Sequence, residues 1–178
     1  MMGFEELLLR LRADYPELKF RVGAKFMYRP PRAVYYEQFM KSESGTVHQS
    51  VNAGAESEQK KYPSQEALGL EGADEAKLAE IEQKYCLQLL HEVGHAVLEH
   101  FSFDTDLERI KIERSAWDKA RQLCDIYNIP YDEDFVEDEL DTYREWLHRR
   151  SVCRKCGMVR YQDRRGVYHC PGCEALGA

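Results

Sequence analysis

The chain has 178 residues, of which 43% are hydrophobic and 32% charged, and its formal net charge is −7 at pH 7. This length can bury one hydrophobic core and carry one small additional module. No apolar run approaches the ~20 residues that a membrane-spanning helix needs, and the first residues lack the pattern of a secretory signal peptide. These features argue against a membrane protein and predict a cytoplasmic protein with no membrane partner.

Charge is unevenly distributed along the chain. Residues 132–141 hold seven carboxylates and no basic side chain, whereas residues 144–178 hold eight Lys or Arg against three Asp or Glu. An acidic body with a basic tail can contact an anionic partner such as nucleic acid through the tail. A polarised, solvated surface explains the same pattern and is the favoured interpretation, with nucleic-acid contact left open.

The first third of the chain predicts a helix followed by a small sheet. Residues 3–14 carry apolar side chains at helical spacing, and Tyr15-Pro16 ends that pattern. Residues 18–39 are rich in aromatic and β-branched side chains and are divided by Pro30-Pro31, which predicts two strands or a hairpin. Residues 40–72 are polar and predict a long surface loop, in which residues 46–51 could form a short strand. His48 lies in that loop and is not expected to bind metal.

Three helices are predicted in the remainder of the body. The first spans residues 73–101 and begins with acidic residues that suit the helix dipole. The second runs from about residue 104 to 127 and stops at Asn128-Ile129-Pro130. The third spans residues 132–149, with an acidic start and a basic end that also match the dipole. Together with the strands, these helices predict an α+β fold.

The motif with the clearest chemistry is HEVGH at residues 91–95, which matches H-E-x-x-H within a helix. Two His residues four apart project from one helix face, so both imidazoles can reach one Zn²⁺. Glu92, beside them, can take a proton from a zinc-activated water as general base and pass it to a leaving amine. Gly94 is small enough to allow close packing above the metal. The motif predicts peptide-bond hydrolysis by a zinc metallopeptidase of the HExxH type.

A catalytic zinc takes three protein ligands, so a third residue is needed beside His91 and His95. The second predicted helix has one stripe of apolar or small residues at spacings of three and four, interrupted by a single carboxylate, Glu113. A charge on a buried face is costly unless it is paired or bound to metal. Glu113 is therefore the expected third ligand, and the alternative is an ion pair with Arg109 at the surface.

Other residues near the motif compete less well for the third position. His100 lies five residues after His95, about 140° around a helix, and so points away from the metal unless the helix ends first. Glu108 is a further candidate. Asp104 and Asp106 are expected to cap the second helix instead.

Four of the six cysteines form two CxxC pairs near the end of the chain. Cys153 and Cys156 are separated from Cys170 and Cys173 by thirteen residues, which predicts a closed Cys₄ zinc ribbon with a hairpin that turns at residues 163–166. Zinc must supply much of the folding free energy of so small a module. Cys86 and Cys124 lie within apolar helical patterns and are expected to be reduced and buried.

With HEVGHAVLEH followed by a helix that carries ERSAWDKA, the chain resembles the ImmA/IrrE-like metallopeptidases. The resemblance covers about residues 18–125, and it implies a zincin-like core. It implies His91 and His95 as zinc ligands, Glu92 as general base, and Glu113 as third ligand in an E-x-x-A-like setting. The chain differs from that family in ending with a zinc ribbon rather than the frequent helix-turn-helix partner.

The combination of HExxH and a C-terminal ribbon also resembles the SprT-like proteases, which act on proteins attached to DNA. That resemblance implies a His beyond the motif as third ligand, for which His100 is poorly spaced. A third alternative is a non-catalytic zinc-binding adaptor, in which Glu92 would have no role. The preferred interpretation is a metallopeptidase domain at residues 1–149 and a Cys₄ ribbon at 150–178. It would use one catalytic and one structural zinc, and act on a protein or peptide substrate.

Overall fold

The structure is a computed structural model that describes residues 2–23, 25–29, 32–36 and 75–175. Helices dominate and the sheets are small, so the fold is α+β, as predicted. The predictions for residues 40–72, including His48, lie outside the described residues. The elements in chain order are α1 (Phe4–Asp14), β1 (Lys19–Val22), β2 (Met27–Arg29), β3 (Ala33–Tyr36), α3 (Glu75–Val97), α4 (Asp106–Tyr127), α5 (Glu133–Ser151), β4 (Tyr161–Gln162), β5 (Tyr168–His169) and α6 (Pro171–Ala175).

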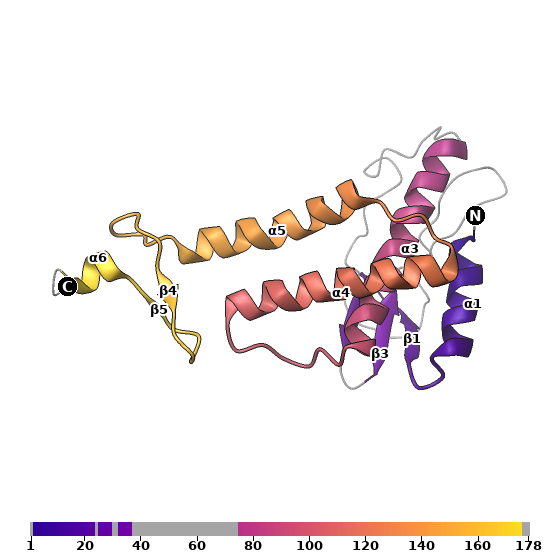
Figure 1. The fold of residues 1–178 in the computed structure, drawn as a ribbon, viewed down its shortest axis with the longest axis horizontal. Helices are drawn as coiled ribbons and strands as arrows, with labels where there is room; N and C mark the ends of the chain where they lie inside the picture. Colours follow the sequence, from indigo (N-terminus) through magenta and orange to yellow (C-terminus); the bar gives the residue numbers. More distant parts are fainter. Residues whose placement is uncertain (1, 24, 30–31, 37–74, 176–178) are drawn as a thin grey trace, which may run out of the picture.

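The hydrophobic core lies at one end of the molecule, where α1, the first sheet and α3 come together (Figure 1). The apolar side chains of α1 are buried there, because their helical spacing places them on one face. Phe4 is fully buried, and its ring contacts those of Tyr36 and Tyr85 at centroid distances of 5.9 and 6.2 Å. The aromatic residues of the strands thus attach the sheet to both helices.

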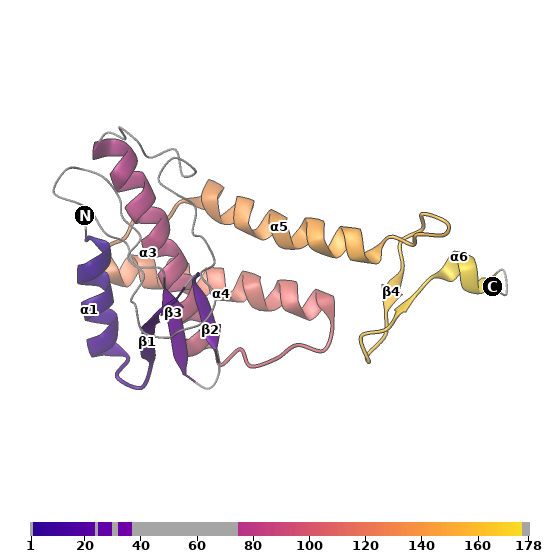
Figure 2. The same cartoon turned by 180° about the vertical axis from the view of Figure 1, so that it is seen from behind.

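The first sheet has three strands in the order β1-β3-β2, with β1 parallel and β2 antiparallel to β3 (Figure 2). The predicted hairpin is confirmed for β2 and β3, but the predicted number of strands was too low, because the chain breaks at Gly23 and the segment before the prolines forms two strands. Only β2 and β3 form a hairpin. Strand β2 lies at an edge of the sheet, and this edge faces the HEVGH motif.

Helix α3 ends at Val97, earlier than the predicted end at residue 101. Glu99 adopts a left-handed conformation with φ of 54°, and the backbone N–H groups of Glu99 and His100 bond the carbonyls of Ala96 and His95 at 3.3 and 3.1 Å. This pair of bonds is a Schellman motif. It turns the chain back over the last helical turn and brings His100 next to His95.

Helices α3 and α4 pack closely at one glycine. A Cβ atom added to Gly94 would lie 2.6 Å from the carbonyl oxygen of Ala116, so no other residue fits there without moving the helices apart. Helix α4 begins with a capping box formed by Thr105 and Glu108. The expectation that Asp104 or Asp106 caps the helix was wrong, because the Thr105 hydroxyl takes that position.

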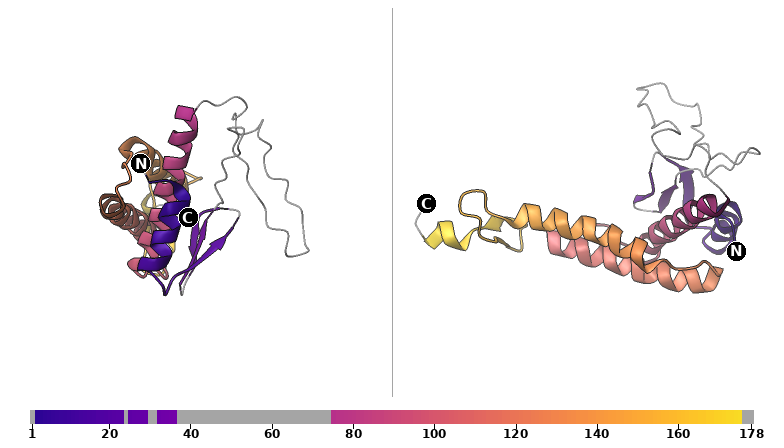
Figure 3. Two further views of the ribbon diagram at one scale, coloured as in Figure 1. Left: turned by 90° about the vertical axis from the view of Figure 1, so that its right-hand side faces the viewer. Right: turned by 90° about the horizontal axis from the view of Figure 1, so that it is seen from above.

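Helix α5 lies alongside α4 and carries the ribbon at its end (Figure 3). Its start is capped by Asp132, which accepts from the backbone N–H of Phe135 at 3.0 Å. None of the described helices is long and apolar enough to cross a membrane. The ribbon consists of the antiparallel β4–β5 pair and the short α6, with the predicted turn closed by Gly166 at φ of 77°.

One buried carboxylate joins the ribbon to the body. Asp106, at the first position of α4, accepts hydrogen bonds from Arg150 at 2.6 Å and from the Tyr168 hydroxyl at 2.8 Å. Its backbone N–H donates to the side chain of Gln162 at 2.7 Å. Residues from α5 and both ribbon strands therefore meet at the start of α4, and these hydrogen bonds fix the position of the ribbon against the body.

Candidate metal centres and cleft

The three residues predicted as metal ligands in the body come together in the structure. Helix α3 supplies His91 and His95, and α4 supplies Glu113. The two Nε2 atoms lie 3.0 Å apart, and each lies 3.3 Å from Glu113 Oε2. All three side chains are buried, with Glu113 only 9% exposed. The buried stripe of α4 thus points its carboxylate at the imidazoles.

These separations can be compared with those around a tetrahedral zinc ion. Bonds of ~2.0–2.1 Å place neighbouring ligand atoms about 3.4 Å apart. The observed distances of 3.0 and 3.3 Å are close to that value. Two imidazoles and one carboxylate are also a donor set that zinc accepts when one position is left for water or substrate. The residues present therefore fit a metal ion.

The charge states of His91 and Glu113 suit metal binding. Burial lowers the pKa of His91 to about 4, which keeps that imidazole neutral near pH 7. Burial alone would raise the pKa of Glu113, but the adjacent imidazoles of His91 and His95 outweigh it and hold the pKa well below its usual range. Neutral imidazoles and an ionised carboxylate are the forms that coordinate a metal.

A chain of hydrogen bonds sets the tautomer of His95. The Ser115 hydroxyl donates to the carbonyl of Ile112 at 2.9 Å, so it accepts from His100 Nε2 at 3.2 Å. Neutral His100 then accepts at Nδ1, which lies 2.9 Å from His95 Nδ1. His95 Nδ1 is therefore the donor, and its Nε2 lone pair faces Glu113 and His91. His100 supports a candidate ligand and is not itself part of the cluster.

The ring of His91 is held differently. It stacks on the indole of Trp117 with centroids 4.2 Å apart and an interplanar angle of 28°. Its Nδ1 is buried and has no hydrogen-bond partner among the described residues. Stacking, together with the helix backbone, orients this imidazole in place of the hydrogen bond that His95 has.

Glu92 lies beside the cluster and contacts the edge strand. The backbone N–H of Tyr28 in β2 donates to Glu92 Oε2. Burial raises the pKa of Glu92 to about 7, against the lowering effects of His95 and of the Tyr28 N–H. A carboxylate with a pKa near neutrality can both accept and release a proton at physiological pH. The oxygen Oε1 is left for that exchange.

A cleft of about 340 Å³ opens over Glu92, His95 and Glu113. Its lining comes from strand β2 and the two residues preceding it, from the segment after α3, and from α3, α4 and α5. Beyond those three residues, the cleft is lined by Lys25, Phe26, Met27, Tyr28, His100, Phe101, Ser102, Phe103, Arg109, Ile112 and Tyr143.

Tyr143 of α5 lines this cleft and an adjacent cavity of about 210 Å³ that also reaches His91 and Glu92. Burial, the negative charge of Glu113 and a hydrogen bond to that carboxylate raise the pKa of Tyr143. The phenol therefore stays protonated and can donate a hydrogen bond within the cleft.

The four cysteines of the ribbon also come together as predicted. Cys153 Sγ lies 3.8 Å from Cys173 Sγ, and Cys156 Sγ lies 3.4 Å from Cys170 Sγ. Zinc–sulfur bonds of ~2.3 Å in a tetrahedron place sulfurs about 3.8 Å apart, so the cluster fits a structural metal site. Hydrogen bonds from the backbone N–H groups of Cys156 and Lys155 lower the pKa of Cys153 to about 6. Such donors stabilise a thiolate ligand.

The glycines next to the two cysteine pairs have different roles. Gly157 follows the first cysteine pair with φ of 73°, as expected for a zinc-binding turn. Gly172 lies within α6, where a Cβ atom would come 2.5 Å from the sulfur of Met158, so its role is close packing. Cys86 and Cys124, outside the ribbon, are both buried and unpaired, as predicted.

Some residues of the site were not identified from sequence. Tyr28 acts through its backbone, which no side-chain pattern reveals. Ser115 and Ala116 lie two and three residues after Glu113, and Ala116, whose backbone carbonyl meets Gly94, could have been sought as a small residue on that face of α4. Arg109 is not paired with Glu113, so that alternative was wrong, because Glu113 turns toward the imidazoles.

Comparison with known proteins does not add to this description. No protein-family model, no curated protein and no solved structure matches the chain.

Proposed function

We propose that the chain is a zinc-dependent metallopeptidase with His91, His95 and Glu113 as zinc ligands and Glu92 as general base. The observation that carries the proposal is the clustering of three buried side chains able to bind a metal, with Glu92 beside them at the base of a cleft. A site that only held a metal for stability would have no use for Glu92 or for an open cleft. A zincin-like core, as in the ImmA/IrrE-like proteases, is part of this proposal.

Zinc at this position would act as a Lewis acid and make water a nucleophile at neutral pH. Glu92 Oε1 accepts a proton from the attacking water and delivers it to the leaving amine. The Tyr28 N–H keeps Oε2 in place during both transfers. Tyr143 turns its single O–H from the Glu113 carboxylate to the oxygen on which negative charge develops. The His100–Ser115 chain holds His95 in the tautomer that binds metal.

Glu92→Gln provides the test, because it keeps the shape of the side chain and removes the base. The zinc-loaded wild-type chain and the variant are incubated with a library of proteome-derived peptides, and new termini are identified by mass spectrometry. We expect cleavage by the wild type and a loss of about 10²–10⁴-fold in the variant. Equal zinc content in both proteins is the control. Unchanged activity in the variant would overturn the proposed mechanism.

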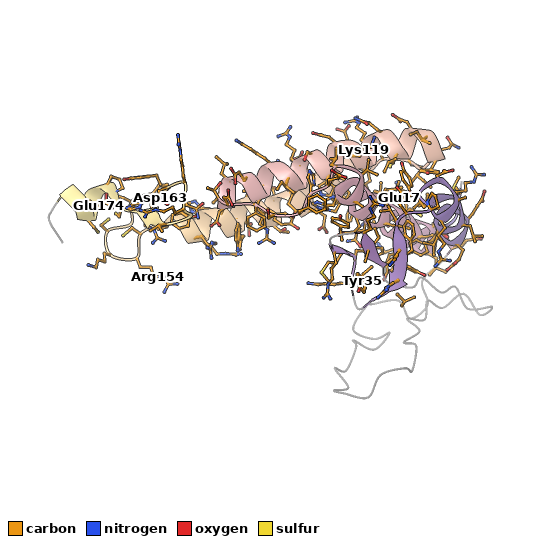
Figure 4. All side chains as sticks on the ribbon, turned by 90° about the horizontal axis from the view of Figure 1, so that it is seen from below. Glu17, Tyr35, Lys119, Arg154, Asp163 and Glu174 are labelled. Carbon is orange, nitrogen blue, oxygen red and sulfur yellow. The ribbon has the colours of Figure 1, made fainter. Side chains whose placement is uncertain are left out.

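A second candidate function, as in SprT-like proteases, is cleavage of proteins on nucleic acid. The observation that favours it is a hollow of about 770 Å³ between α5 and the ribbon, with five basic side chains on its wall. In Figure 4, Arg154 of this wall lies with the ribbon, at the opposite end of the molecule from Glu17 and Tyr35. The wall is lined by Trp146, Arg149, Arg150, Cys153, Arg154, Lys155, Arg160, Tyr168, Cys170, Cys173 and Glu174.

Salt-dependent binding of single-stranded DNA tests this second candidate. We expect the double variant Arg154→Gln/Lys155→Gln to bind more weakly and with a shallower salt dependence than the wild type, by about 0.7 per lost phosphate contact. Arg144→Gln, on the body side of α5 and outside the hollow, is the control. Binding that is absent or independent of salt would exclude this function and leave the metallopeptidase proposal untouched.

A further inference from the structure

One basic residue in the wall of the cleft is not used by the proposed reaction. Arg109 lies on α4 one helical turn before Glu113, which places the two residues on the same helix face. It lines the cleft together with Glu92 and His95. Any peptide that reaches the metal must therefore pass close to this side chain.

Three aromatic rings surround the Arg109 guanidinium. Its central carbon lies 5.5 Å from the ring centroid of Phe103, 5.4 Å from that of Tyr143 and 4.8 Å from that of Trp146. Contacts of this kind attract the cation to the ring faces. They leave the N–H donors, which lie in the guanidinium plane, free to bind an acceptor. The rings thus hold the group in place without satisfying its hydrogen bonds.

Arg150 shows what a purely structural arginine looks like in this region. It lies over the same Trp146 ring, at 5.0 Å, but its Nε also donates to Asp106 at 2.6 Å. Among the described residues, no carboxylate forms an ion pair with Arg109. Glu108, the adjacent residue, accepts from the backbone N–H groups of Asp104 and Thr105, and Glu113, one turn further on, faces the imidazoles. Anchoring therefore accounts for Arg150, whereas the donors of Arg109 have no acceptor among the described residues.

The charged side chains that line the cleft also favour a negatively charged ligand. Lys25 lines the same cleft as Arg109, so the cleft carries a second basic side chain. The carboxylates that line the cleft are Glu92 and Glu113, and both are occupied by the proposed metal chemistry. A planar guanidinium that is fixed in position and open at its edge matches the geometry of a carboxylate.

We propose that Arg109 binds a carboxylate of the substrate, so that the cleft selects acidic peptides. This inference rests on the proposed metallopeptidase function and names its substrate class. Extended peptides advance about 3.3 Å per residue, so the bound group lies within about three residues of the cleaved bond. The carboxylate is either an Asp or Glu side chain or the C-terminus of the peptide.

Matched peptides test the inference on the full-length, zinc-loaded chain. A peptide that the wild type cleaves is resynthesised with Glu, Gln or Lys at each of three positions on either side of the bond. Each version is made with a free or an amidated C-terminus, which separates a side-chain carboxylate from a terminal one. Rates of cleavage are measured for all versions. Binding of the same peptides to the zinc-loaded Glu92→Gln variant is measured by calorimetry, so that recognition is read without turnover.

At one position, we expect the Glu peptide to bind and react about 10–100-fold better than the Gln peptide, the range of one charged hydrogen-bonded pair. A preference for the free C-terminus over the amide would identify the terminal carboxylate instead. Arg109→Gln should abolish the preference, Arg109→Lys should keep part of it, and Arg109→Glu should reverse it toward Lys. Arg114→Gln, exposed on the same helix outside the cleft, should behave as wild type.

The possible results distinguish a failure of the Arg109 inference from a failure of the proposed metallopeptidase function. Cleavage at equal rates whatever the charge and terminus, or a preference that persists in Arg109→Gln, overturns the inference and leaves the metallopeptidase intact. No cleavage of any peptide overturns both. Zinc content and thermal unfolding of the Arg109 variants are measured in parallel. Partial rescue by Arg109→Lys shows that charge, and not packing alone, carries the effect.

Discussion

The Nδ1 atoms of His95 and His100 lie 2.9 Å apart, because α3 ends at Val97 and a Schellman motif turns the chain back. His100 is thereby placed behind a candidate metal ligand and not among the ligands. Its imidazole donates to the Ser115 hydroxyl through Nε2 and accepts from His95 through Nδ1, so the Ser115 hydroxyl determines which nitrogen of His95 carries the proton. Partners of this kind fix both the tautomer and the orientation of a coordinating imidazole.

Replacement of His100 by alanine should weaken zinc binding at the body site about 10–100-fold. The reason is that His95 loses the acceptor that keeps its Nε2 lone pair toward the metal. Affinity is measured by competition with a chelator of known strength. His148→Ala, on the exposed side of α5, is the control and should leave affinity unchanged. An unchanged affinity in His100→Ala would show that the helix backbone alone orients His95.

Elemental analysis should find two zinc ions in each purified chain, one at each ligand cluster. His91→Ala and Glu113→Ala should each reduce the content to about one, because two remaining ligands bind zinc weakly. Cys153→Ala should also leave about one zinc, and that zinc should still support peptide cleavage. A wild-type protein with a single zinc that only Cys153→Ala loses would contradict the catalytic site.

Gly94→Ala should destabilise the chain by about 1–3 kcal/mol and weaken the body metal site. The added methyl group would lie 2.6 Å from the Ala116 carbonyl oxygen, so α3 and α4 must separate and carry Glu113 away from the imidazoles. Urea unfolding and zinc affinity measure the two effects. Adding Ala116→Gly should not rescue the variant, since the obstacle is a backbone atom. Rescue by that second change would show that the obstacle is the Ala116 side chain and not its backbone carbonyl.

Asp106→Asn should destabilise the junction between ribbon and body by about 1–3 kcal/mol, because hydrogen bonds to a charged group are lost. Burial raises the pKa of Asp106, but the bonds from Arg150 and Tyr168 outweigh it and hold the pKa below the usual 3.8. A lowered folded-state pKa means that the carboxylate stabilises the protein above pH ~4, and that this contribution disappears as the pH falls through the folded-state value.

Urea unfolding of wild type and Asp106→Asn at several pH values measures this linkage. The difference in unfolding free energy should be full at pH 6–7 and should shrink below pH ~4. Asp118→Asn, exposed on the same helix, is the control and should show little difference at any pH. If the difference in unfolding free energy between Asp106→Asn and wild type were constant across this pH range, the charge of Asp106 would not be what stabilises the junction with the ribbon.

Tyr143→Phe should lower kcat on a cleaved peptide by about 10²-fold and change KM little, since the hydroxyl is proposed to act on charge that develops during the reaction. Zinc content should stay the same, because the phenol is not among the clustered metal ligands. A Tyr143→Phe variant with normal kcat would assign oxyanion stabilisation to another donor of the cleft.

Local periodicity alone was enough for much of the candidate site. His91 and His95 face one side of α3 because four residues make about one helical turn. The cysteine spacing placed four thiols together because two short turns and a hairpin can close only one way around a metal. Glu113 was chosen because it interrupts an apolar stripe, and the structure confirms that it is buried among the imidazoles.

Tertiary structure decided what depends on distance and rotation between elements. The approach of α3 and α4 at Gly94 sets how far Glu113 reaches, and a helix pattern carries no information on the separation of two axes. The role of His100 depended on where α3 ends, and a non-glycine residue, Glu99, adopts the left-handed conformation there. Arg109 is held in the cleft wall because a ring from the segment after α3 and two rings from α5 meet around it. Sequence thus determined which groups share a helix face, whereas packing determined which faces meet.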